Sequence, residues 1–159
     1  MSLTANQKRV SAVALAIAIA IPAEGTRQWA YKDPGDGRPT ICFGTTRGVK
    51  LGDFKTLPEC KALITQDMQS AVDAVERCGP LSMSVNQMAA FADLVYNVGP
   101  TPVCNTATST LARKLKAGDV IGACNELPKW DKARVGGVLI PLPGLTKRRA
   151  MEKELCLSQ

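Results

Sequence analysis

The sequence of 159 residues contains no histidine, and this absence excludes several kinds of chemistry. A Ser-His-Asp triad, a Cys-His dyad and a zinc site with histidine ligands all require an imidazole. Acid–base catalysis in this chain must therefore use Asp, Glu, Lys, Tyr or Cys side chains. The sequence also lacks a phosphate-binding loop and a cluster of metal ligands, so we expect neither a cofactor nor a metal.

Aromatic residues are scarce, at 4% of the chain, although the net charge is +6. A basic surface attracts nucleic acid, anionic lipid or anionic wall polymers. Nucleic-acid binding also needs a known motif or aromatic side chains interleaved with the basic ones, so we expect no nucleic-acid partner. Basic residues concentrate near the C-terminus. They form either a solvated helix face or a surface that attracts the anionic wall. They are Lys129, Lys132, Arg134, Lys147, Arg148, Arg149 and Lys153.

The six cysteines form no CxxC motif, which excludes a zinc ribbon and a thioredoxin-type site. They lie at Cys42, Cys60, Cys78, Cys104, Cys124 and Cys156, at least 18 positions apart. Buried free thiols are one interpretation, because cysteine behaves as a small hydrophobe. The even number and the wide spacing favour disulfides, and hence export. Roughly 15 pairings are open for six cysteines.

The longest apolar run, Val10 to Ile21, has 12 residues and follows the basic pair Lys8 and Arg9. As a helix it would be about 18 Å long, well short of the roughly 30 Å hydrocarbon core of a bilayer. Three interpretations compete: a cleaved signal peptide, a buried core helix, and a weak anchor that exports the protein and then leaves the bilayer uncut.

Two carboxylates follow this run, either as ordinary solvated surface groups or as the pair that a glycosidase needs. The apolar helix is predicted to end at Glu24-Gly25, and Asp33 follows after eight intervening residues. Residues 35–39 are rich in turn formers, and a short strand is predicted near Thr40 to Gly44. A glycosidase needs one carboxyl to protonate the glycosidic oxygen and a second to act as base or nucleophile.

This stretch resembles the catalytic signature of phage-type lysozymes, glycoside hydrolase family 24. The signature has Glu-Gly, an Asp after eight residues, and a Thr that opens a short Thr-Ile-Cys/Gly-x-Gly segment, here Thr40-Ile41-Cys42-Phe43-Gly44. Between Asp33 and Thr40 there are six residues where the family usually has five, so Asp36 is an alternative second carboxylate. Residues 91–99, 123–130 and 142–149 resemble further blocks of the family, in the same order.

The resemblance implies an α+β, mainly helical fold, with a small N-terminal α/β lobe joined by a long helix to a helical C-terminal lobe. By carry-over, Glu24 is the general acid, a role that desolvation at the end of an apolar helix would favour. Asp33 would stabilise the transition state or activate water, and Thr40 would position that water. Asn97 would face the sugar, although an Asn before Gly99 is also typical of a helix end.

The implied activity is that of an endolysin, a muramidase that cuts the β-1,4 MurNAc–GlcNAc bond of peptidoglycan and so lyses the bacterial host. The family resemblance favours water attack with inversion. A lytic transglycosylase and a non-catalytic wall-binding or membrane-disrupting module are the alternatives. We expect a monomer.

Loss of the residues before Glu24 would remove its helix, which favours the uncut anchor. The chain in this respect resembles the signal-anchor-release (SAR) endolysins. We therefore expect residues 1–23 to be a signal-anchor segment that also supplies the first helix, and residues 24–159 to be the catalytic domain. Residues 10–21 would insert transiently into the inner membrane and export the protein to the periplasm.

Capping patterns predict most of the remaining helices. Thr56-x-x-Glu59 predicts a helix that runs to about Glu76, and Ser84-x-x-Gln87 predicts the next one. Further helices are expected over residues 105–116, from Asp119 to about residue 127, and over residues 146–157.

Overall fold

The structure is a computed structural model that describes residues 3–158. Residues 1–2 of the expected anchor segment and Gln159 of the expected catalytic domain lie outside the described residues. In chain order the elements are α1 (Ala5–Glu24), β1 (Arg27–Lys32), β2 (Pro39–Cys42), α2 (Leu57–Cys78), α3 (Val85–Val98), α4 (Thr101–Cys104), α5 (Thr110–Lys116), α6 (Val120–Glu126), the 3-10 helix η1 (Leu127–Trp130), β3 (Lys132–Val135), β4 (Val138–Pro141) and α7 (Pro143–Leu157).

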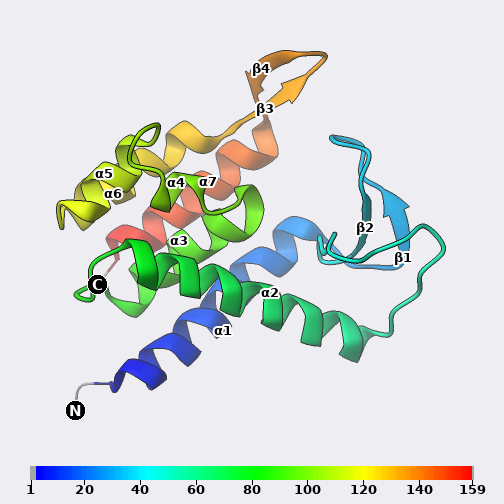
Figure 1. Cartoon of the computed structure of the whole chain (residues 1–159), viewed down its shortest axis with the longest axis horizontal. Coiled ribbons are helices and arrows are strands. Elements are labelled where there is room, and N and C mark those ends of the chain that lie inside the picture. The colour runs from blue at the N-terminus through cyan, green and yellow to red at the C-terminus, as the bar shows by residue number, and fades with distance from the viewer. Residues whose placement is uncertain (1–2, 159) are drawn as a thin grey trace.

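The elements form the two lobes that the family resemblance implies (Figure 1). The antiparallel pair β1–β2 makes the small lobe, and α2 extends from it into the helical lobe. The helical lobe contains α3 to α7 and carries a second antiparallel pair, β3–β4. The expected α+β, mainly helical architecture is confirmed.

Helix α1 contains the whole apolar run and packs against α3 and α2. It begins with a capping box formed by Thr4 and Gln7, and Glu24 is its last residue. Ala12, Ala16 and Ala20 are fully buried, while the intervening Ala14 and Ala18 are exposed. Among residues 3–158, no helix has both the length and the hydropathy needed to cross a membrane.

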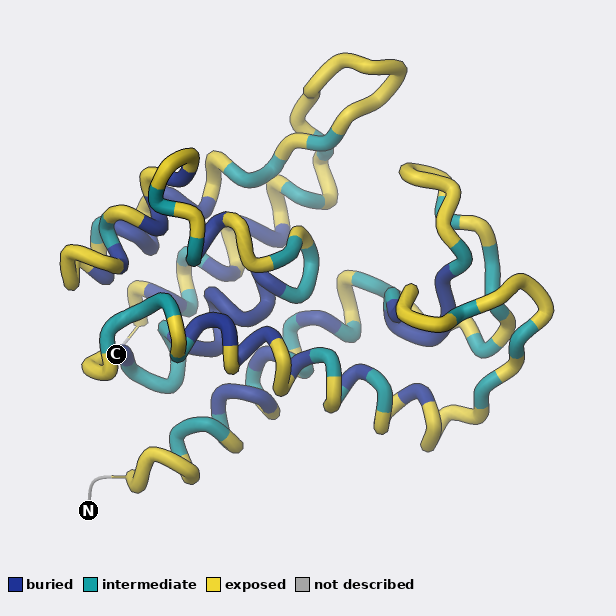
Figure 2. Tube along the Cα trace, viewed as in Figure 1, coloured by how far each residue is buried: buried dark blue, intermediate teal, exposed yellow. Residues whose placement is uncertain are grey.

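Helix α3 is the centre of the helical lobe, since α1, α2, α4 and α7 all pack against it. It is the most continuously buried element, as the tube in Figure 2 shows. Phe91 and Leu94 fill the space between the helices, and Ala89, Ala90 and Ala92 let the neighbouring helices approach. Asp93 is also fully buried, which requires partners for its charge.

Most helix boundaries agree with the predictions, with one clear exception. The helix expected from residue 105 begins only at Thr110. The Asn105 side chain accepts hydrogen bonds from the backbone N–H groups of Ala107 and Thr108, which stabilises a turn there. Ser109 then accepts a hydrogen bond from the Ala112 N–H and so caps the helix one turn later than predicted.

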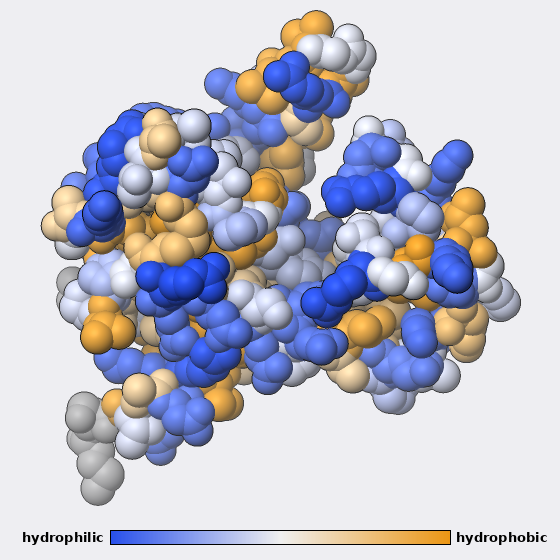
Figure 3. All heavy atoms as spheres, viewed as in Figure 1, coloured by the Kyte–Doolittle hydropathy of each residue, from blue (hydrophilic) through white to orange (hydrophobic). Residues whose placement is uncertain are grey.

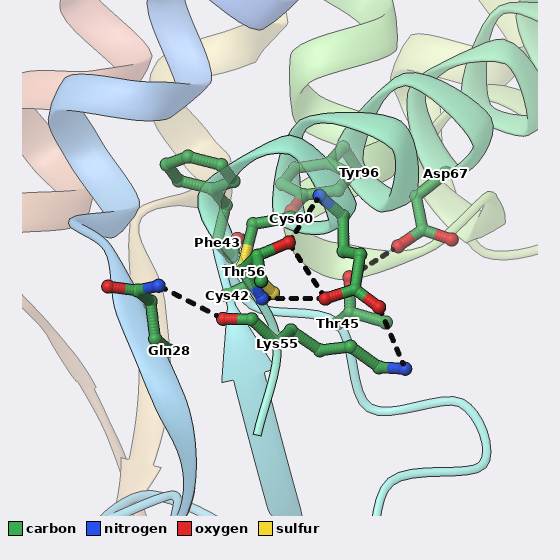
Figure 4. Close-up of a disulfide and its surroundings, with 10 residues drawn as sticks. Gln28, Cys42, Phe43, Thr45, Lys55, Thr56, Cys60, Asp67 and Tyr96 are labelled. Atoms are coloured by element: carbon green, nitrogen blue, oxygen red, sulfur yellow. Dashed lines mark hydrogen bonds and ion pairs between the residues drawn. A yellow bond between two sulfur atoms is a disulfide. The ribbon is translucent and has the colours of Figure 1, made fainter. Parts of the chain in front are cut away.

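All six cysteines form disulfides, as the export argument predicts. Cys42–Cys60 joins β2 to α2, and Figure 4 shows it beneath the start of that helix. Cys78–Cys104 joins the end of α2 to α4, and Cys124–Cys156 joins α6 to α7. Each bond therefore fixes two elements that are separate in sequence.

Replacing both Cys124 and Cys156 by Ala should lower the free energy of unfolding by about 3–4 kcal/mol, because the bond closes a loop of 32 residues. Denaturant titration of the oxidised protein and the double variant measures this difference. The wild type should also become less stable when it is treated with a reductant. As a control, a substitution outside the disulfides should lower the free energy of unfolding by the same amount with and without the reductant.

Candidate active-site cleft

A cleft of about 480 Å³ lies between the two lobes, and both contribute to its lining. Figure 3 shows the hollow between the small lobe and the projecting β3–β4 pair. All four predicted site residues line this cleft. The lining residues include Glu24, Tyr31, Asp33, Asp36, Arg38, Thr40, Gly44, Tyr96, Asn97, Lys132, Ala133, Arg134 and Leu145.

Glu24 reaches the cleft because α1 ends there. Gly25 follows with φ +68°, a left-handed conformation that favours glycine and turns the chain toward β1. The Glu24 carboxylate lies against Gly44, whose φ is +107° and where an added Cβ would be 3.3 Å from Oε2. A glycine at this position therefore leaves the space that the carboxylate occupies.

Arg148 of α7 fixes the orientation of Glu24. Its Nη1 donates to Glu24 Oε1 at 2.5 Å, while Nε and Nη2 donate to the two oxygens of Asp93 at 2.9 and 2.7 Å. Burial alone would lower the pKa of Arg148, but the hydrogen bonds and charges of Asp93 and Glu24 outweigh it and raise the pKa above its ordinary value. The guanidinium thus joins α1, α3 and α7 at the base of the cleft.

Arg149, the next residue, holds a second cleft residue in the same way. Its Nη2 donates to Asn97 Oδ1 at 3.1 Å and to Glu152 Oε1 at 2.7 Å. Arg149 and Glu152 are fully buried, and burial raises the pKa of the Glu152 carboxyl. Because a guanidinium only donates, it binds the oxygen of Asn97 and leaves the amide nitrogen free to face the cleft.

The two aspartates of the small lobe differ in their surroundings. Asp33 Oδ1 accepts hydrogen bonds from the backbone N–H groups of Gly35 and Asp36, at 2.7 and 3.3 Å. The Asp36 carboxylate is exposed and pairs with Arg38 at 2.5 Å, and the hydrogen bond from Arg38 lowers the Asp36 pKa. Within residues 3–158, Asp33 Oδ2 has no hydrogen-bond partner, whereas both oxygens of Asp36 have one.

Thr40 and Tyr96 complete the wall between the carboxylates. Thr40 is 3% exposed, and its Oγ1 donates to the Arg38 carbonyl at 3.1 Å. Tyr96 donates to the Phe43 carbonyl at 2.5 Å and so links α3 to the end of β2. Burial raises the pKa of Tyr96, so its hydroxyl stays protonated and acts as a donor.

The expectation that the C-terminal basic residues lie at the surface is wrong for two of them. Arg148 is 6% exposed and Arg149 is fully buried, whereas Lys129, Lys132, Arg134 and Lys147 are exposed. No local sequence pattern signals this difference, because the partners Asp93 and Asn97 lie more than 50 positions away.

The pattern of the phage lysozyme family matches residues 22–152 of this chain. The chain belongs to this family. It is 36% identical over 149 residues to a SAR-endolysin of Pseudomonas phage phiKMV, which covers 94% of this chain and 90% of the relative. It is therefore a glycoside hydrolase of the lysozyme type.

Solved structures show the same fold. The muramidase domain of SpmX from Asticaccaulis excentricus is 30% identical, with a TM-score of 0.76 over 94% of this chain and 96% of that one. The active form of the P1 phage endolysin Lyz is 23% identical, with a TM-score of 0.77 over 99% and 96% of the two chains. The second match shows similarity of fold alone.

Replacing Arg148 by Met should lower the free energy of unfolding by about 3–5 kcal/mol, because it leaves the buried Asp93 charge unpaired. Hydrolytic activity should fall with it, since Glu24 loses the group that orients it. Chemical denaturation and a cell-wall clearing assay measure the two effects. Arg47→Met is the matched control, because the Arg47–Asp67 ion pair lies at the surface and contributes little. Equal stability of the two variants would contradict the role given to Arg148.

Proposed function

We propose that this protein is an endolysin that hydrolyses the β-1,4 bond between MurNAc and GlcNAc in peptidoglycan. The observation that supports it most directly is the convergence of Glu24, Asp33, Thr40 and Asn97 on one cleft. These residues come from α1, the small lobe and α3, so the cleft has an acidic group on each side of a space open to solvent. The cleft needs no metal or cofactor for this reaction.

In the proposed mechanism Glu24 protonates the glycosidic oxygen as the bond to the anomeric carbon breaks. A water molecule attacks that carbon from the opposite face, and Asp33 accepts its proton. Thr40, held by its bond to the Arg38 carbonyl, orients this water. The products are two shorter glycan chains, and the configuration at the cut carbon is inverted.

Asp33 is the better second carboxylate, with Asp36 as the alternative. The two backbone N–H donors fix the Asp33 carboxylate through Oδ1 alone. Its Oδ2 remains available for water. The Asp36 oxygens bind Arg38 through both its side chain and its backbone N–H, so a water would have to displace them.

Glu24→Gln and Asp33→Asn should each reduce hydrolysis by about 10²–10⁴-fold, the usual effect of removing a catalytic acid or base. Asp36→Asn is the matched control and should keep activity near the wild-type level. Clearing of outer-membrane-permeabilised cells measures all three. Full activity of Glu24→Gln would contradict the mechanism, and loss of activity in Asp36→Asn alone would transfer the second role to Asp36.

The products distinguish hydrolysis from the action of a lytic transglycosylase. Hydrolysis leaves a reducing end on each new chain, whereas a transglycosylase leaves an anhydro sugar end. Mass spectrometry of the released fragments should show reducing ends. Binding to the wall without any fragments would instead support a non-catalytic wall-binding module.

We also propose that α1 first serves as a temporary anchor in the inner membrane and then docks in the enzyme in the periplasm. The helix is apolar on its exposed side as well as its buried side, since Ala14 and Ala18 face solvent in the fold. A core helix that also exposes an apolar face is expected to contact a second apolar environment, which we propose is the inner membrane. Arg9, on the cytoplasmic side of the inserted segment, would pair with Asp73 and Glu76 only after docking.

Ala14→Lys separates the two roles of α1. A lysine at an exposed position should leave the docked enzyme folded and active, but it should block insertion, at a cost of about 2.5–3.5 kcal/mol for a charge in the bilayer centre. Ala14→Leu is the matched control and should insert normally. Fractionation of expressing cells and the activity of the purified proteins measure both effects. Normal export of Ala14→Lys, or an active protein whose N-terminus begins beyond Ile21, would contradict the anchor.

A further inference from the structure

The β3–β4 hairpin projects from the helical lobe (Figure 1), and its strands are joined by Gly136 and Gly137. Both glycines have positive φ, +57° and +83°, as a two-residue type I′ turn requires. In such a hairpin the residues that flank the turn, Val135 and Val138, form a hydrogen-bonded pair.

Cross-strand pairs along an antiparallel ladder alternate between hydrogen-bonded and non-hydrogen-bonded pairs. This alternation decides whether the backbone groups of a residue point toward the partner strand or away from it. Two cross-strand pairs are therefore non-hydrogen-bonded: Arg134 with Leu139, and Lys132 with Pro141. Proline, which has no N–H, fits at such a position. One step further, the Leu142 N–H donates to the Asp131 carbonyl at 3.0 Å, as the alternation requires. The backbone N–H and C=O groups of Arg134 and Lys132 thus point away from β4.

This outer edge of β3 faces the cleft. Lys132, Ala133 and Arg134 all line it, and no residue of β4 does. Successive side chains of a strand point to opposite faces of the sheet. A strand that lines the cleft with three consecutive residues therefore presents its edge, and not one face, to the cleft. Within residues 3–158, no group outside the β3–β4 ladder hydrogen-bonds to the backbone of Arg134. An open strand edge therefore lies at the rim of the cleft.

We propose that the β3 edge binds the peptide stem of the substrate as an added β-strand. The proposal rests on the proposed function, because a glycan in the cleft carries its stems on the muramic sugars and these must leave the cleft at its rim. An exposed edge with free N–H and C=O groups pairs with an extended peptide through main-chain hydrogen bonds. The stem carries carboxylates, and the exposed Lys132 and Arg134 side chains complement their charge.

The two edges of the hairpin are not equivalent, which supports a specific role for β3. The outer edge of β4 carries Pro141, whose missing N–H weakens pairing there, and β4 does not reach the cleft. The Arg134 guanidinium contacts only the Gly137 carbonyl among the described residues, at 3.1 Å, so most of its donors remain free for a carboxylate.

The test removes one outward N–H without breaking the hairpin. Arg134→Pro deletes the N–H on the cleft edge, and Leu139→Pro deletes the matching N–H on the far edge of the same cross-strand pair. Arg134→Ala removes the charge and keeps the N–H. Each variant is assayed on glycan strands with intact stems and on strands whose stems an amidase has removed. Thermal unfolding shows that each variant is folded.

For Arg134→Pro, kcat/KM on stem-bearing strands should fall about tenfold relative to stem-free strands, mainly through KM, as loss of a hydrogen bond and a charge predicts. Arg134→Ala should show a smaller fall, and Leu139→Pro should retain the wild-type ratio. An unchanged ratio in Arg134→Pro, or an equal fall in Leu139→Pro, would overturn the proposal. A loss that is the same on both substrates would do so as well, because it would assign the edge to the sugar.

A binding measurement keeps this inference separate from the proposed function. A synthetic tetrapeptide stem is titrated into the Glu24→Gln protein and followed by NMR. Shifts should centre on residues 132–135 and should vanish when Arg134→Pro is added. Their absence would overturn the peptide site even if the wild type cleaves peptidoglycan. A wild type that cleaves neither glycan would instead overturn the proposed function.

Discussion

The geometry of the cleft depends on one buried guanidinium. Arg148 binds both oxygens of Asp93 on α3 and one oxygen of Glu24 on α1, and it lies on α7 itself. Three helices that are far apart in sequence are therefore joined by three charge-assisted hydrogen bonds that are shielded from solvent. The carboxylate of Asp93 alone would neutralise the charge of Arg148. The second carboxylate is that of Glu24, so the same guanidinium also orients a residue that we propose for catalysis. The position of Glu24 thus depends on the docking of two other helices.

Under the anchor role that we propose, helix α1 must meet two sets of physical requirements. As a core helix it presents small alanines to α3, which allows close packing but leaves little apolar area per residue to stabilise docking. As a transient anchor it must be apolar on every side yet only weakly held by lipid. A run of alanine and isoleucine meets both requirements. The ion pairs of Arg9 with Asp73 and Glu76 then add contacts that only the docked helix can make.

Much of the fold was predictable because its signals are local. Capping boxes at Thr56 and Ser84 mark the starts of α2 and α3, and the structure contains both. Glu24, Asp33 and Thr40 were found through the spacing of a family signature, and the cleft brings them together. The hairpin was missed although its signal is local too, since Gly136-Gly137 between β-branched residues is typical of a type I′ turn. The burial of Arg148 and Arg149 was not predictable, because it depends on how α3 and α7 pack.

The base and the rim of the cleft are held by different interactions, and we expect them to differ in rigidity. Its base is made of buried charges that pair with one another, Arg148 with Asp93 and Glu24 and Arg149 with Glu152, and these pairs favour one arrangement of the side chains. Its rim is made of turns and a two-stranded hairpin, and a two-stranded hairpin on its own is only marginally stable in water. The chemical groups at the base must be positioned before the substrate arrives, because misplacement of an acid costs rate directly. The rim has no such constraint. If the β3 edge binds an added strand, as we propose, the new hydrogen bonds would stabilise the hairpin, and substrate binding would order the outer wall of the cleft.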